Sequence, residues 1–184
     1  MTAIPSTLYA IEMNLLKLFK KKEQSNPKLP STVFEAEATL YSDKILIVTV
    51  DKVKEGFGLS STKLTILPTD AASELIGFTL RKQLALTEHG LSIPKDYKQH
   101  YSGFLSAAGF KNAKEHHKDA LHLMIGQKDG IISITPTHNG GATGKERGFI
   151  VTKEMTDVKV SNDVSNTELG EQVKAAWKLC TKSV

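Results

Sequence analysis

The stretch VKVSNDVSNTELGEQVKAAWKL, residues 158–179, predicts a short β-strand, a polar turn and a helix. Ser165 followed three residues later by Glu168 is typical of a capping box at a helix start. Apolar residues then recur at helical spacing and define one face of that helix: Leu169, Val173, Ala176, Trp177 and Cys180. We therefore expect the chain to close with an amphipathic helix.

A similar pattern occurs 93 positions earlier, in LTILPTDAASELIGFTLRKQLAL, residues 64–86. At this offset Asp70 aligns with Asp163, Gly77 with Gly170, Arg81 with Lys174, and Leu84 with Trp177. Two copies of strand, turn and helix indicate related halves, residues 33–90 and 118–182. Two copies are a weak statistical signal, so the sequence leaves open whether the halves are a true duplication.

The composition is that of an ordinary soluble globular protein. The chain has 184 residues, of which 40% are apolar and 24% charged. This length is sufficient for one well-buried domain, and no low-complexity tract or clear linker divides the middle of the chain. We expect residues 1–184 to form a single domain.

A net charge of +4 is a weak pointer to nucleic acid or an anionic membrane. Lys174, Lys178 and Lys182 form a basic stripe on the closing helix, but no aromatic residues interleave with them. Nucleic-acid readers usually show such interleaving. We expect the stripe to be a solvated helix face and no nucleic acid to be bound.

The single cysteine, Cys180, cannot form an internal disulfide. This usage indicates a reducing compartment, so we expect a cytoplasmic protein. Because free cysteine is among the most buried residue types, Cys180 is expected to be a small core residue rather than a reactive thiol.

Residues 6–22 predict an N-terminal amphipathic helix, with Leu8, Ile11, Leu15, Leu18 and Phe19 on one face. The lysine run follows the apolar part instead of preceding it, unlike a secretory signal, and the segment is too short and too charged to span a bilayer. We expect it to pack on the domain and not on a membrane. Docking to a membrane surface is the sharper alternative.

The rest of the chain alternates strands and helices in mixed order. Residues 34–40 alternate like a half-buried strand with Glu35 and Glu37 on its wet face, and residues 45–50 are typical of a buried central strand. Asp129 and Gly130 predict a tight hairpin. Residues 52–61 are expected to be a loop, and Asp70 to cap the helix that follows. The prediction is an α+β fold with mixed, largely antiparallel sheets and flanking helices.

The glycine-rich run 137–148 does not fit a phosphate-binding loop. In the phosphate-binding pattern a glycine opens the motif and a hydroxyl follows the lysine. Here Asn139 and Glu146 occupy those positions around Gly144 and Lys145. His116, His117 and His122 likewise lack the spacing and the second ligand pair of a zinc site.

Signatures of catalysis are also absent. The chain contains no Gly-x-Ser-x-Gly elbow, and the Glu35/Glu37 pair is expected to be solvated. We therefore expect no catalytic residues, no metal and no cofactor. A binding protein that is not an enzyme is the interpretation that remains.

The C-terminal half resembles the CdiI immunity proteins of bacterial contact-dependent growth inhibition (CDI) systems. The resemblance lies in IISITP (131–136), the loop NGGATGKERGF (139–149), the strand ending at Val160 and ELGEQVKAAWKLC (168–180). It implies a cytoplasmic protein that binds the C-terminal domain of a CdiA-type toxin, one to one, and blocks it. Many such toxin domains are basic nucleases, which fit a basic protein poorly unless its acidic residues cluster.

For the partner-binding surface we expect the glycine-rich loop, and specifically His138, Lys145 and Arg147. Pairing with an exposed strand edge is the other route to contact. The main alternative function is a small ligand-binding protein or enzyme with a pocket between the two halves, using His122 or His138. A peripheral membrane adaptor that uses residues 6–22 is a third.

Overall fold

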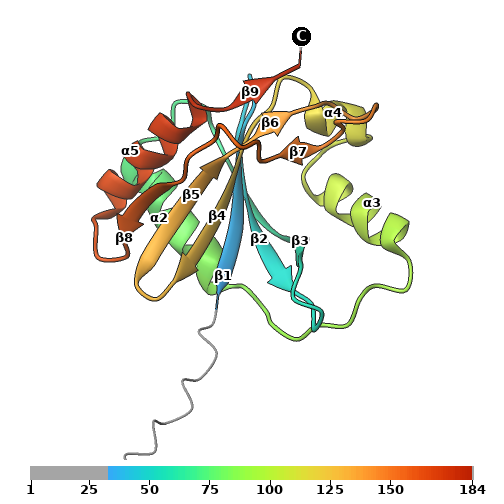
Figure 1. The fold of residues 1–184 in the computed structure, drawn as a ribbon, viewed down its shortest axis with the longest axis horizontal. Helices are drawn as coiled ribbons and strands as arrows, with labels where there is room; N and C mark the ends of the chain where they lie inside the picture. Colours follow the sequence, from blue (N-terminus) through green and yellow to red (C-terminus); the bar gives the residue numbers. More distant parts are fainter. Residues whose placement is uncertain (1–32, 184) are drawn as a thin grey trace, which may run out of the picture. The chain divides into compact units, whose positions relative to one another are not determined.

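The computed structural model describes residues 33–183, so the helix predicted over residues 6–22 lies outside the described residues. The elements in chain order are β1 (Phe34–Leu40), β2 (Ile45–Lys52), β3 (Gly58–Leu67), α2 (Ser73–Ala85), α3 (Tyr97–Ala107), α4 (Ala113–His117), β4 (Leu121–Lys128), β5 (Ile131–Pro136), β6 (His138–Asn139), β7 (Phe149–Ile150), β8 (Val158–Ser161), α5 (Asn166–Trp177) and β9 (Thr181–Lys182) (Figure 1).

The main sheet has six strands in the order β3-β2-β1-β4-β5-β8, and every neighbouring pair is antiparallel. A small second sheet, β7-β6-β9, contains one parallel pair. The predicted α+β class with mixed, largely antiparallel sheets is confirmed. The strand order is also symmetric about the β1–β4 junction, because each side consists of three antiparallel strands that lead into a helix, α2 or α5.

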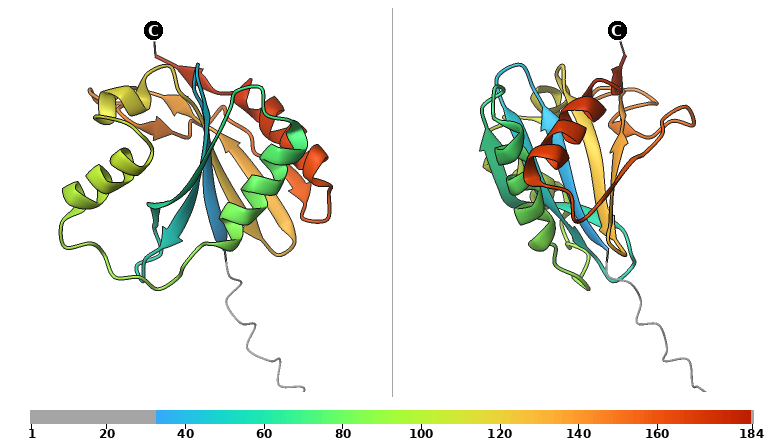
Figure 2. Two further views of the ribbon diagram at one scale, coloured as in Figure 1. Left: turned by 180° about the vertical axis from the view of Figure 1, so that it is seen from behind. Right: turned by 90° about the vertical axis from the view of Figure 1, so that its left-hand side faces the viewer.

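Helices α2 and α5 pack against each other and cover one face of the sheet (Figure 2). Their buried residues include Ile76, Leu80 and Leu84 on α2, and Leu169, Val173 and Trp177 on α5. The sheet contributes Ala36, Ala38, Ile45, Ile47, Leu123, Ile125, Ile132 and Ile134 to the same core. The apolar face predicted for the closing helix is therefore confirmed, and Ser165 caps it by accepting a hydrogen bond from the Glu168 amide.

Two long basic side chains, one on each helix, donate hydrogen bonds to the backbone that precedes the other helix. Arg81 of α2 donates to the Asn162 and Val164 carbonyls in the turn before α5. Lys174 of α5 donates to the Ala71 carbonyl, just before α2, over 2.8 Å. The aligned positions of the two segments thus play equivalent roles. Common origin of residues 33–90 and 118–182 stays a prediction.

The other face of the sheet is covered only in part. Helix α3 packs over β2 and β3 around a smaller cluster of Tyr41, Leu46, Val48, Phe104, Leu105, Ala108 and Ala120. His116 of α4 lies against Phe104 in this cluster. Figure 1 shows α3 and α4 toward the β3 side, with no helix in front of β4 and β5. Met124 of β4, for example, remains 46% exposed.

Two local predictions are wrong. Residues 58–61 belong to β3, because the Val50–Ser60 and Lys52–Gly58 pairs extend the β2–β3 ladder beyond Leu64. Asp70 does not cap α2, which begins after Ala72 without a side-chain cap. The Asp129–Gly130 hairpin is confirmed, and both residues have positive φ angles, 50° and 79°.

Candidate functional site

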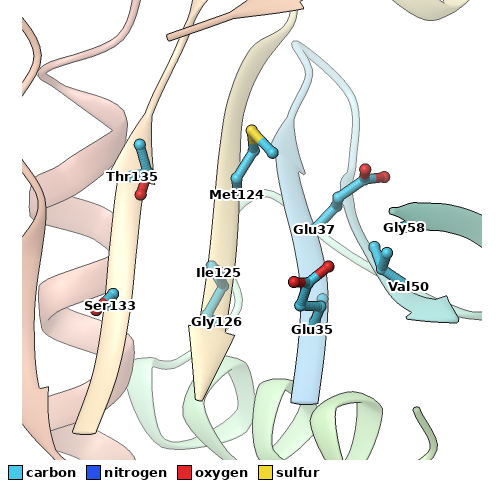
Figure 3. Close-up of a pocket in the computed structure, with 10 residues that line it drawn as sticks. Glu35, Glu37, Val50, Gly58, Met124, Ile125, Gly126, Ser133 and Thr135 are labelled. Carbon is cyan, nitrogen blue, oxygen red and sulfur yellow. The ribbon is translucent and has the colours of Figure 1, made fainter. Parts of the chain in front are cut away.

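A hollow of about 270 Å³ lies on the uncovered face of the sheet, across the junction between β1 and β4. The register of the strands sets its walls, since Glu37 lies opposite Met124, and Met124 lies opposite Thr135. One step along, Gly126 lies between Glu35 and Ser133. Figure 3 shows Glu35 and Glu37 on β1 beside Met124 on β4.

The alternation of β1 explains why both carboxylates are here. Ala36 and Ala38 point into the core under α2 and α5, so Glu35 and Glu37 emerge on the opposite face. That face was predicted correctly, but the carboxylates are half-buried and not fully solvated. The hollow also joins strands from both halves of the chain.

The carboxylates around the hollow differ in their partners. Glu35 forms an ion pair with Lys52 at 2.8 Å. Glu37 accepts a hydrogen bond from the Ser60 hydroxyl at 2.9 Å. Among residues 33–183 no lysine, arginine or histidine forms a salt bridge with it.

Burial raises the pKa of Glu37 from 4.5 to about 7, and the negative charge of Glu35 adds to this shift, while the Ser60 hydrogen bond opposes it. Burial therefore makes the charged form of Glu37 energetically unfavourable at neutral pH. A cation placed beside it would lower that pKa again.

Gly126 leaves the hollow open at its base. A Cβ built on it meets no heavy atom within 4 Å. Its backbone also avoids the left-handed region, since its φ is not among the positive values. A Cβ at this position would therefore project into the hollow without meeting a described atom.

The glycine-rich loop connects β6 and β7, away from the hollow, and folds into a closed turn. The Gly140 amide donates to the Gly148 carbonyl at 3.0 Å, and the Gly148 amide to Gly141 at 2.8 Å. A Cβ on Gly140 would overlap the backbone of Glu146, so the close approach requires glycine there. Lys145 and Arg147 are exposed on this turn.

His138 differs from the other two predicted contact residues. It lies half-buried on β6, and its ring nitrogens are hydrogen-bonded to the Thr181 and Ser183 hydroxyls at 2.8 and 3.0 Å. It thereby ties the loop to the C-terminal strand β9. A pocket between the two halves was predicted only for the alternative function, with His122 or His138 as its polar group. The carboxylates that line the hollow were not predicted as a site, although the Glu-Ala-Glu-Ala alternation of β1 was a signal for its acidic wall.

His116 and His122, which were considered as metal ligands or pocket residues, are hydrogen-bonded inside the fold. His116 pairs with the Tyr41 hydroxyl at 2.8 Å, and His122 with Thr39 at 2.9 Å while it stacks on Phe149. Burial lowers the pKa of both to about 3. His122 does not line the hollow between the halves. Residues 33–183 hold no group of three or more metal-ligating side chains placed to bind an ion.

Comparison with known proteins identifies the family. The model of the CDI immunity protein family, CdiI, matches residues 34–180, which is nearly the whole described fold. The chain belongs to the CdiI family. The resemblance of residues 131–180 is therefore confirmed and extends over both halves. This CdiI chain is an immunity protein, a class that neutralises toxins.

Two solved structures share the CdiI fold. A protein of unknown function, NMB0488 from Neisseria meningitidis, superimposes with a TM-score of 0.67 and 21% identity, covering 81% of this chain and 96% of the other. The CdiA-CT/CdiI toxin and immunity complex from Yersinia pseudotuberculosis gives a TM-score of 0.65 and 16% identity, covering 82% and 98%. A comparison with curated protein sequences gave no match. In the described part of the chain no helix is long and apolar enough to cross a membrane.

Proposed function

We propose that this CdiI protein binds the C-terminal toxin domain of its cognate CdiA-type protein, one to one, and blocks the toxin in the cytoplasm. The match of the family model over residues 34–180 carries this proposal. The similar Yersinia chain comes from a toxin and immunity complex, so a chain of this fold can hold such a partner.

Inhibition by occupancy needs no catalytic group. The polar groups of the interior are satisfied, since no buried side-chain nitrogen or oxygen among the described residues lacks a hydrogen-bond partner. Contact with the toxin would therefore use the exterior of the protein. The uncovered sheet face and the closed glycine-rich turn are the two surfaces we propose for it. A tight complex needs roughly 800 Å² on each partner.

Lys145 and Arg147 are the loop residues proposed to contact the toxin directly, because both are exposed on a turn held by backbone hydrogen bonds. His138 belongs to the same surface, and its bonds to Thr181 and Ser183 fix the base of that turn. The cytoplasmic location is supported by Cys180, a free thiol whose pKa is raised by burial and which packs at the edge of the core.

The test is protection of growing cells. The toxin domain encoded next to this chain is expressed from one inducible promoter and the chain from another. Expression of the toxin domain alone should arrest growth, and coexpression of this chain should restore it, whereas a CdiI protein paired with a different toxin should not. Continued arrest in cells that contain soluble chain would contradict the proposal.

A further inference from the structure

We propose that the hollow on the uncovered sheet face receives one lysine or arginine side chain of the toxin domain, with Glu37 as its ion-pair partner. This inference rests on the proposed function and names the surface that performs it. The occupant is a basic side chain carried by a protein, because the hollow places a carboxylate that has no cation among the described residues beside apolar surface.

The charge pattern of the hollow carries the argument. The neighbouring carboxylate of Glu35 is neutralised by Lys52, at 2.8 Å. Glu37 lies half-buried beside it with the Ser60 hydroxyl as its hydrogen-bond partner. A half-buried carboxylate is costly without a cation, and this cost disappears when a partner supplies one. The protein is therefore locally acidic at this point in spite of its net charge of +4.

The walls suit a long basic side chain better than a free ion. Met124 and Val50 line the hollow with apolar surface against which an aliphatic stem can pack. Ser133 and Thr135 line its β5 side and offer hydroxyl acceptors for the remaining N–H groups. Met124 is exposed and adaptable, as is common at surfaces that mould around a partner.

Access depends on Gly126. Any other residue on β4 at this position would place a side chain between Glu35 and Ser133, inside the hollow. The space is about 270 Å³, which is in the range of one long side chain and below the usual volume of a small-molecule pocket.

Two substitutions test the assignment by different routes. Glu37→Gln keeps the shape and the Ser60 contact but removes the charge. Gly126→Val fills the hollow and leaves the charge, and a β-branched residue suits a strand. Glu171→Gln is the control, because it makes the same charge change at an exposed position on α5, on the opposite face. Thermal unfolding of each variant establishes that it is folded.

The readout is calorimetric titration with the toxin domain encoded next to this chain. Glu37→Gln should weaken binding by at least about 30-fold, as expected when one partner of a desolvated charge pair is removed. Gly126→Val should weaken it by at least about tenfold, and Glu171→Gln by less than about twofold. A scan of toxin lysines and arginines should find one whose removal has little further effect in the Glu37→Gln background.

The failures are distinguishable. If the unaltered protein binds the toxin and both Glu37→Gln and Gly126→Val bind equally well, the hollow is not the contact and the immunity function stands. If the unaltered protein does not bind, the inference falls together with the proposed function. Binding lost by Glu37→Gln but also by Glu171→Gln would overturn the inference, because it would reflect net charge alone.

Discussion

Gly77 of α2 lies directly against the backbone carbonyl of Asn166, the first residue of α5, so closely that a Cβ on Gly77 would overlap it. The relationship is reciprocal, since a Cβ on Gly170 would overlap the carbonyl of Ser73, the first residue of α2. Each helix therefore presents its fifth residue to the start of the other. Glycine at both positions allows the two helices to cross at close range.

Replacing Gly77 or Gly170 with alanine should force the helices apart. We expect each substitution to lower the free energy of unfolding by about 1–3 kcal/mol, in spite of the better helix propensity of alanine. The double variant should lose less than the sum, because one separation relieves both clashes. Urea denaturation measures these changes.

Gly103 on α3 is the matched control for the glycine pair. It is exposed, and a Cβ there meets nothing within 4 Å. Gly103→Ala should therefore stabilise the protein by about 0.5–1 kcal/mol. Equal effects at all three glycines would contradict the close crossing of α2 and α5.

Arg81 fixes the turn before α5. Its guanidinium donates to the Asn162 and Val164 carbonyls and to the side chains of Asn162 and Asn166. A lysine cannot reproduce this fork of donors. Arg81→Lys should cost about 1–3 kcal/mol of stability, measured by urea denaturation, and amide hydrogen exchange at residues 162–166 should accelerate. Unchanged exchange there would contradict this role.

The buried histidines predict instability in acid. His116 and His122 have folded pKa values of about 3, lowered from 6.5 by burial, so the unfolded chain binds more protons between these values. The stability from the neutral rings is fully present above about pH 6.5 and is lost as the pH falls toward 3. Each ring contributes a slope of up to about 1.4 kcal/mol per pH unit.

Glu37 acts in the opposite direction. Its folded pKa is raised to about 7 from 4.5, so it favours the folded state increasingly as the pH falls through that interval. Unfolding in urea at pH 7, 6 and 5 should show a net loss of stability, a shallower loss in His122→Gln and a steeper loss in Glu37→Gln. Parallel curves for the three proteins would show that these groups do not control the profile.

The glycine-rich turn predicts an electrostatic contribution to toxin binding. Replacing His138, Lys145 and Arg147 together with alanine should slow association with the toxin domain several-fold at low salt, and less at high salt. Because Lys145 and Arg147 are exposed, their double variant should keep its melting temperature. Unchanged binding by the triple variant would show that this loop is not a contact.

Local patterns in the sequence were sufficient for much of the fold. The alternation of residues 34–40, the Asp129–Gly130 turn and the Ser165 cap each depend on neighbours in the chain, and the structure has all three. The start of β3 was missed because Gly58 and Ser60 resemble loop residues. Their strand conformation comes from pairing with β2, which local propensity does not reveal.

The residues that line the hollow could not be predicted for a related reason. It exists because β1 pairs with β4, which places Glu37 opposite Met124 although 87 residues separate them. The raised pKa of Glu37 depends on that same burial. Sequence alone showed which face of β1 carries the carboxylates, but not which strand would lie beside it.

The central claim is that this protein binds and neutralises one toxin domain. Calorimetric titration at near-physiological salt, with the C-terminal domain of the CdiA-type protein encoded next to this chain, tests it most directly. We predict one-to-one binding tighter than about 10 nM, corresponding to about −11 kcal/mol. No heat of binding between the two folded proteins at micromolar concentration would contradict the claim.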